Sequence, residues 1–189
     1  MGSIFKNNFV RRLIVILALV GIVIFVDNAT TFLRRAYPVE YYSIVEENAK
    51  KYKIDPYLVM ALIKAESGFN KSAESDKDAK GLMQLTDETA FWAAEKLGIT
   101  GFNSNDLFEP ETNIELGCWY LNELLTEFEN NSNLALASYN AGRGTVKEWV
   151  EKGILEIDDT NADDIPYNET RIFVKRVLNY LKIYHNLYN

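Results

Sequence analysis

Apolar positions recur along most of this chain with the spacing of an α-helix. Between residues 39 and 53 the apolar positions are Tyr41, Ile44, Val45, Ala49 and Tyr52. Residues three or four apart share one face of a helix, so this spacing predicts an amphipathic helix. No segment alternates convincingly with period two, which is the pattern of a half-buried strand. The chain is therefore predicted to fold as an all-α domain.

The next predicted helix lies between Asp55 and Gly68 and carries both end signals. Asp55 is a good N-cap, and Pro56 suits the first helical position. Gly68 is a usual left-handed C-terminal stop. Glu66 shares the apolar face with Ile63, three residues before it. Burial and the negative end of the helix dipole both raise a carboxyl pKa, which makes Glu66 a candidate general acid. In the alternative interpretation, Glu66 ends the helix and turns to solvent.

Five further helices are predicted after residue 85. They start near residues 86, 110, 133, 145 and 167, and the second of them is the longest. Thr86 and Asn133 are the expected N-caps of the first and third helices, and Thr145-x-x-Glu148 is a capping-box pattern for the fourth. Residues 69–80 and 156–165 are polar and are interpreted as loops.

The N-terminus carries a candidate membrane anchor. Lys6, Arg11 and Arg12 precede an uncharged apolar run, Leu13–Val26. Its fourteen residues span only about 21 Å, less than the roughly 30 Å hydrocarbon core, so local thinning would have to make up the difference. A cleaved signal peptide is the alternative, but a small-residue cleavage pattern is missing. We expect residues 1–38 to form a cytoplasmic basic flank, an uncleaved anchor and a linker, with the domain outside.

Charge and composition narrow the function classes. The 189 residues have a net charge of −7 and are 48% hydrophobic, which is typical of a globular protein. Five basic residues and one acidic residue lie in residues 1–39, which leaves 15 basic and 26 acidic residues on 40–189. A domain of this charge is a poor candidate for binding nucleic acid.

Metal and thiol chemistry are not expected. Cys118 is the only cysteine and lies on an apolar stripe, so it is predicted to be a core residue. His185 is the only histidine, which disfavours a His-based triad or a zinc cluster. The Asp76-x-Asp78 pattern superficially resembles a calcium loop, but a lysine occupies a ligand position and the twelfth residue is Asp87. No cofactor and no metal are predicted.

Three short motifs follow one another in a set order. They are Glu66-Ser67, Gly81-Leu82-Met83-Gln84 and Ala137-Ser138-Tyr139-Asn140-Ala141-Gly142. Their order and distances resemble the soluble lytic transglycosylase family of peptidoglycan-cleaving enzymes, which is related to goose-type lysozyme. The resemblance covers roughly residues 40–184. It implies a lysozyme-like helical fold with a sugar-binding groove in residues 39–189.

The same resemblance implies a mechanism with one carboxylate, whereas most glycosidases need two. The substrate would be the linkage between N-acetylmuramic acid and N-acetylglucosamine. Glu66 matches the catalytic position. It would protonate the leaving oxygen and then take a proton from the C6 hydroxyl of the same muramyl residue, which closes a 1,6-anhydro ring without water.

Further residues are implied to bind the substrate: Ser75, Gly81, Met83, Gln84, Tyr139, Asn140 and Glu169. Gly81 would let the backbone approach the sugar, and Met83 would form an apolar floor or pack in the core. Gln84 offers amide groups, and the Tyr139 hydroxyl could bond Glu66 or the substrate. Asn140 would support a turn. Ser75 would lie near the lactyl or C6 region, and Glu169 would line or brace the groove.

Three positions depart from the family pattern. Phe173 stands where tyrosine is usual, Ser138 replaces an alanine, and Thr86-Asp87 stands where Met-Pro is common. None involves the catalytic position, so we expect them to affect sugar binding more than chemistry.

Two other functions fit parts of the pattern. One is a lysozyme-type hydrolase in which Asp76 or Asp78 positions water. The other is a catalytically silent wall-binding module held at the membrane. The expected partners are peptidoglycan strands and, through the N-terminal helix, a membrane, and the protein is expected to be a monomer.

Overall fold

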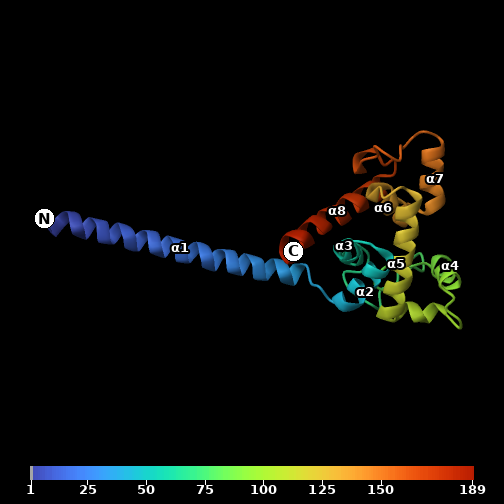
Figure 1. The fold of residues 1–189 in the computed structure, drawn as a ribbon, viewed down its shortest axis with the longest axis horizontal. Coiled ribbons are helices and arrows are strands. Elements are labelled where there is room, and N and C mark those ends of the chain that lie inside the picture. Colours follow the sequence, from blue (N-terminus) through green and yellow to red (C-terminus); the bar gives the residue numbers. More distant parts are fainter. Residues whose placement is uncertain (1) are drawn as a thin grey trace. The chain divides into compact units, whose positions relative to one another are not determined.

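A computed structural model describes the backbone of residues 2–189 and the side chains of residues 10–189 (Figure 1). The described residues form eight α-helices and two short 3-10 helices, and two isolated β-bridges are the only strand-like pairings among them. The all-α prediction is thereby confirmed. The chain divides into two compact units, Met1–Pro38 and Val39–Asn189. The side chain of Lys6, in the predicted basic flank, lies outside the described residues.

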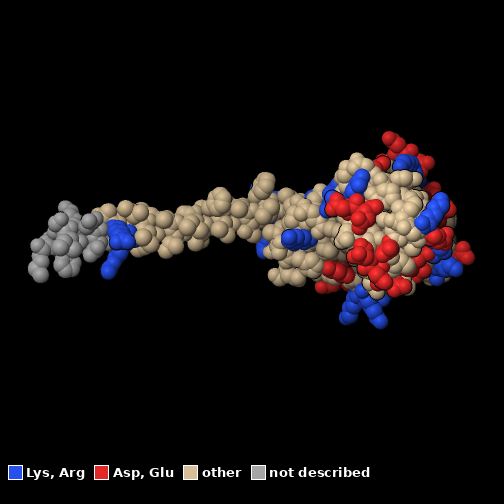
Figure 2. Space-filling model, turned by 90° about the horizontal axis from the view of Figure 1, so that it is seen from above, with Lys and Arg blue, Asp and Glu red and all other residues tan. Residues whose placement is uncertain are grey.

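The first unit consists of one long helix, α1 (Gly2–Ala36), which extends well beyond the predicted apolar run. Its segment Val10–Ala36 is long and apolar enough to cross a membrane, with a mean hydropathy of 2.5. Its 27 residues extend about 40 Å, more than the roughly 30 Å hydrocarbon core. Large apolar side chains are exposed along it, and Phe25 is 74% exposed. On the face shown in Figure 2, the middle of α1 carries uncharged side chains. These properties fit a membrane anchor, and an N-terminal signal sequence would share them.

The second unit contains the remaining elements. They are α2 (Tyr42–Tyr52), α3 (Pro56–Glu66), α4 (Asp87–Leu97), η1 (Ser104–Phe108), α5 (Pro110–Glu127), α6 (Ser132–Ala141), α7 (Arg143–Glu151), η2 (Ala162–Asp164) and α8 (Asn168–Tyr188). The long helix α5 contacts α2, α4, α6 and η1, while α8 packs along α3 and α6 (Figure 1). The buried stripe of α5 is therefore the centre of the hydrophobic core.

Several helix ends follow the local signals in the sequence. The Asp55 carboxylate caps α3 by accepting a hydrogen bond from the N–H of Tyr57 at 2.8 Å. Thr86 caps α4 by accepting one from the N–H of Thr89 at 3.3 Å. Gly98 ends α4 in the left-handed conformation, with φ of 69°. The two N-caps, Asp55 and Thr86, were predicted and are confirmed.

Two predicted N-caps are wrong, by two residues in α6 and by three in α7, whose N-cap is Gly142. The N-cap of α6 is Asn131 rather than Asn133, because the Asn131 carboxamide oxygen accepts hydrogen bonds from the N–H groups of Asn133 and Leu134 at 2.9 and 3.2 Å. Those bonds satisfy donors of the first turn that would otherwise lack partners. Helix α7 begins at Arg143, so Thr145 lies inside its first turn and cannot act as the N-cap.

Close backbone packing holds the turn at Gly81 against η1 and α5. Gly81 has φ of +74°, and a Cβ there would lie 2.1 Å from the Leu107 carbonyl oxygen and 2.3 Å from Asn113 Nδ2. On α5, a Cβ at Gly117 would lie 2.3 Å from the sulfur of Met83. A side chain at either position would overlap neighbouring protein atoms, so glycine is required at both.

We predict that Gly81→Ala destabilises the domain far more than Gly98→Ala. Both positions have positive φ, but a Cβ at Gly98 would meet no atom within 4 Å. Left-handed strain alone costs an alanine about 1–2 kcal/mol, and overpacking adds about 1–3 kcal/mol at Gly81. Urea unfolding of the two variants measures the difference. Equal losses of stability would show that the turn at Gly81 is not closely packed.

Candidate active site

Glu66 is the last residue of α3, a helix in which Tyr57 to Ile63 are all buried. Its side chain is partly buried, and burial raises the pKa of Glu66 to about 8, although the positive charge of Arg176 on α8 acts in the opposite direction. A carboxyl group with this pKa is still mostly protonated at neutral pH. The end of α3 therefore presents a group that can donate a proton.

The turn Gly81–Gln84 lies against the end of α3. The hydroxyl of Ser67, the residue after Glu66, donates a hydrogen bond to the carbonyl of Leu82 at 2.8 Å. Gln84 adopts a positive φ of 48°, and its side-chain Nε2 donates to the carbonyls of Ala73 and Gly81 at 3.1 and 3.0 Å. The amide of Gln84 is thereby fixed in place by its own turn.

Asn113 on α5 is fully buried beneath this turn. Its side-chain oxygen accepts a hydrogen bond from the N–H of Met83 at 2.8 Å. Its side-chain nitrogen donates to the carbonyls of Lys80 and Leu107 at 3.0 and 2.8 Å. The sequence analysis did not single out Asn113. The available signal was an amide in the apolar stripe of α5, a position where a polar side chain needs buried partners.

Tyr139 on α6 connects the turn with Glu66. Its hydroxyl donates a hydrogen bond to the Met83 carbonyl at 2.8 Å. Burial raises the pKa of Tyr139 well above its usual value, and the charge of Glu66 adds to this effect. The phenol therefore lies within electrostatic reach of Glu66. Its O–H donates a hydrogen bond to the Met83 carbonyl, so the phenol oxygen can act only as an acceptor for another group.

A pocket of about 660 Å³ opens beside Tyr139. It is lined by Lys77, Gln84, Leu85, Thr86, Glu88, Thr89, Trp92, Tyr120, Tyr139, Asn140, Ala141, Gly142, Arg143 and Gly144. Gln84, Tyr139 and Asn140 are thus the sequence-predicted binding residues that reach it. Glu66 is outside this lining, but its charge acts on the pKa of Tyr139, which is part of the lining.

Aromatic side chains form one wall of the pocket. The Tyr120 ring lies 5.3 Å from the ring of Tyr139, and Trp92 lies 6.1 Å from Tyr120. Trp92 also packs edge-on against Trp119 at 4.8 Å. Aromatic faces with polar neighbours are a suitable surface for sugar rings or other amphipathic groups.

The other sequence-predicted binding residues lie elsewhere. Met83 is fully buried and Gly81 contacts Leu107 and Asn113, so both shape the turn from inside rather than line the pocket. The Ser75 hydroxyl accepts hydrogen bonds from the N–H groups of residues 77 and 79 at 3.3 and 3.1 Å, which organises its own loop. Glu169 is exposed in the first turn of α8.

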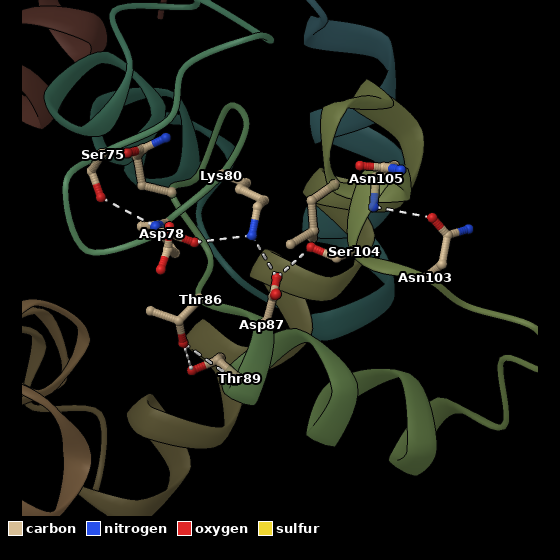
Figure 3. A network of polar contacts seen from close by, with 12 residues as sticks. Ser75, Asp78, Lys80, Thr86, Asp87, Thr89, Asn103, Ser104 and Asn105 are labelled. Atoms are coloured by element: carbon tan, nitrogen blue, oxygen red, sulfur yellow. Dashed lines mark hydrogen bonds and ion pairs between the residues drawn. The ribbon is translucent and has the colours of Figure 1, made fainter.

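A polar network braces the loop that precedes the turn (Figure 3). Asp87 accepts hydrogen bonds from Ser104 at 2.6 Å and from the Lys80 ammonium group at 2.9 Å. Both bonds lower the pKa of Asp87, and the bond from Ser104 has the larger effect. In the calcium-loop alternative, the Lys80 and Asp87 positions supply ligands. In the structure Lys80 and Asp87 form an ion pair with each other, so the calcium-loop interpretation has no support.

The site can therefore carry out general acid catalysis beside a partly aromatic pocket. The acid is supplied by Glu66, and the pocket offers the side-chain oxygen of Gln84 as an acceptor and the amide of Asn140 as donor and acceptor. Over the described residues, no group of three or more histidine, cysteine, aspartate or glutamate side chains is arranged to hold a metal ion.

Comparison with known proteins finds related sequences and structures. A family model described as "Transglycosylase SLT domain" matches residues 43–156. The soluble lytic murein transglycosylase of Escherichia coli (strain K12) is 35% identical over 150 residues, which are 78% of this chain and 23% of that protein. Membrane-bound lytic murein transglycosylase C of Salmonella arizonae is 36% identical over 118 residues, which are 57% of this chain and 32% of that protein.

The fold agrees with these sequence matches. The structure of an inactive glutamate-to-glutamine mutant of lytic transglycosylase Slt from Pseudomonas aeruginosa superposes with a TM-score of 0.73 at 33% identity. The superposition covers 82% of this chain and 25% of that one. This chain thus spans about a quarter of the length of the first curated relatives that it matches.

We predict that Glu66→Gln becomes more stable relative to the wild type as pH rises. The folded pKa of about 8 lies above the unfolded value of about 4.5, so the unfolded state loses its proton first. The wild type therefore loses stability between about pH 4.5 and 8, by at most about 1.4 kcal/mol per unit. Glutamine removes this dependence.

Thermal melts of both proteins at pH 5 and pH 8 measure the effect. Glu47→Gln, on the exposed face of α2, is the matched control and should follow the wild type at both pH values. A constant difference between Glu66→Gln and the wild type would contradict the raised pKa.

Proposed function

This chain belongs to the transglycosylase SLT domain family, and we propose that it is a peptidoglycan lytic transglycosylase. Its substrate is the β-1,4 bond between N-acetylmuramic acid and N-acetylglucosamine, and its product ends in a 1,6-anhydromuramyl residue. The observation that carries this proposal is a partly buried carboxyl group with a raised pKa, Glu66, at the end of a buried helix near a pocket. The inactive glutamate-to-glutamine mutant of the Pseudomonas aeruginosa relative supports it.

The proposed reaction uses Glu66 twice. Glu66 first gives its proton to the glycosidic oxygen, and the C1–O bond breaks with its electron pair going to the leaving sugar. The resulting carboxylate then takes the proton of the muramyl C6 hydroxyl as that oxygen bonds to C1. One proton is given and one is taken back, so no water is consumed. A pKa of about 8 suits both steps near neutral pH.

Arg176 favours the ionised form of Glu66, which acts as the base in the second step. Its positive charge stabilises the carboxylate form of Glu66 and so limits the rise in pKa caused by burial. An acid buried without such a charge would resist ionisation and would give up its proton less readily. Arg176 is exposed on α8, and the sequence analysis did not identify it.

The binding residues divide into those that contact the sugars and those that hold the site in shape. We propose that Gln84, Tyr139 and Asn140 contact the glycan, because they line the pocket. Buried Gly81 and Met83 keep the turn in place. Loop residue Ser75 and exposed Glu169 would reach the substrate from the margins of the site.

We also propose that α1 anchors the protein in the membrane with the domain on the extracytoplasmic side, where it acts as a monomer on glycan strands. The support is the 27-residue segment Val10–Ala36, whose uncharged apolar run Leu13–Val26 follows Lys6, Arg11 and Arg12, and a membrane-bound relative.

Digestion of purified peptidoglycan in heavy-oxygen water is expected to release 1,6-anhydromuropeptides without label, as mass spectrometry can show. Label in the new ends would indicate hydrolysis, as in a lysozyme-type enzyme that uses Asp76 or Asp78 to position water. Absence of any product would favour a wall-binding module.

Glu66→Gln is expected to lower the rate of this digestion by at least about 10²-fold, because glutamine keeps the shape but cannot transfer the proton. Glu47→Gln should retain the wild-type rate. Wild-type turnover by folded Glu66→Gln would eliminate the proposed mechanism.

Cell fractionation tests the anchor. The full-length chain is expected in the membrane fraction, and its domain should be digested by protease added outside wall-stripped cells. A shortened, freely secreted protein would show that the N-terminal segment is a cleaved signal sequence instead.

A further inference from the structure

Two cationic side chains line the pocket although the domain is acidic. Lys77 and Arg143 are in the lining, with Glu88 as its only acidic residue among those described. Residues 40–189 as a whole carry 15 basic and 26 acidic side chains, and acidic side chains are prominent on the face shown in Figure 2. The lining therefore has more basic than acidic side chains, in contrast to the domain as a whole, although Glu127, outside the lining, forms an ion pair with Arg143.

Arg143 is held in a fixed orientation. Its Nε and one terminal nitrogen donate to the two carboxylate oxygens of Glu127, the latter at 3.1 Å. Its guanidinium group lies over the Trp92 ring, 5.4 Å from the centroid. A guanidinium has five N–H donors in a rigid fork, and Glu127 uses two of them. The remaining donors are positioned before any ligand arrives.

The position of Arg143 relates it to the catalytic acid. The aromatic wall runs from Trp92 through Tyr120 to Tyr139, which lies within electrostatic reach of Glu66. Arg143 lines the same pocket as the three rings of this wall, so a ligand that fills the pocket reaches it. Lys77 enters the same pocket from the loop before the Gly81–Gln84 turn.

These features point to one chemical group. The sugars of a peptidoglycan strand are neutral, whereas the peptide stems on the muramyl residues carry carboxylates. An arginine fork with donors to spare is suited to a carboxylate, and a nearby lysine adds a point charge. We propose that this pocket binds a carboxylate of the peptide stem, with Arg143 as the principal contact and Lys77 as the second. The proposal rests on the function proposed above and adds a preference for strands that carry free stem carboxylates.

The test compares two substrates that differ in whether the stem carboxyl groups are charged carboxylates or neutral amides. Purified strands with their stems are used as isolated or after carbodiimide-mediated amidation of the stem carboxylates with ammonia. The full-length protein is assayed in detergent, and kcat/KM for release of anhydromuropeptides is measured on each. We expect the wild type to prefer the free carboxylates by about tenfold, the size of one charge-assisted hydrogen bond at a partly exposed site.

Variants assign this preference to residues. In Arg143→Gln the preference is expected to fall close to one, and in Lys77→Gln by about threefold. Lys147→Gln is the matched control, because Lys147 is exposed one turn further along α7 and is not part of the pocket lining. It should keep the full preference.

The outcomes separate this inference from the proposed function. Equal use of both substrates by the wild type, with anhydromuropeptides released from each, would refute the carboxylate site and leave the function intact. The same conclusion follows if folded Arg143→Gln keeps a tenfold preference. If Arg143→Gln does not fold, an unchanged preference in Lys77→Gln refutes the proposal. Absence of anhydromuropeptides from both substrates would refute the function itself.

Discussion

The backbone of Met83 is held on both sides, and the geometry of the site depends on it. Its N–H donates to Asn113 on α5, and its carbonyl accepts from Tyr139 on α6, both at 2.8 Å. Ser67, at the end of α3, bonds the preceding carbonyl, that of Leu82. Three helices thus meet on two adjacent peptide groups. Because these groups are shielded from water, leaving one without a partner costs about 1–3 kcal/mol. A shift of the turn would break bonds to α3, α5 and α6, and the bond from Ser67 holds the end of α3, where Glu66 lies, against the turn.

Burial of Glu66 illustrates how such a site trades stability for function. The carboxyl group sits where its charge is poorly solvated, so its pKa rises to about 8 and its neutral form prevails. A lysine or arginine in direct contact would relieve this penalty, but it would also lower the pKa and remove the acid. Arg176 acts more weakly, since burial remains the larger effect. Arg176 therefore keeps Glu66 from being either permanently protonated or permanently ionised, and a group that both donates and accepts a proton must avoid both conditions.

Sequence patterns anticipated the parts of this structure that depend on local chemistry. The caps at Asp55 and Thr86 and the apolar face of α3 follow from residues within one or two turns, and they were predicted correctly. The start of α6 was misplaced because two nearby asparagines could serve as the cap, and only the fold selects Asn131. Asn113 and Arg143 were not anticipated, since their partners lie 30 and 16 residues away in sequence. Long-range pairs of this kind leave no periodic signal along the chain.

The departures from the family pattern are best understood through the same network. Asp87, where proline is common, bonds Ser104 and the ammonium group of Lys80, and the carbonyl of Lys80 accepts a hydrogen bond from Asn113. The polar substitution therefore joins η1 and α4 to the scaffold that holds the turn. Phe173 is buried within α8 at 5% exposure, where a tyrosine hydroxyl would need a buried partner. Both changes thus alter what supports the site, while the acid at the end of α3 and the aromatic wall beside it remain in place.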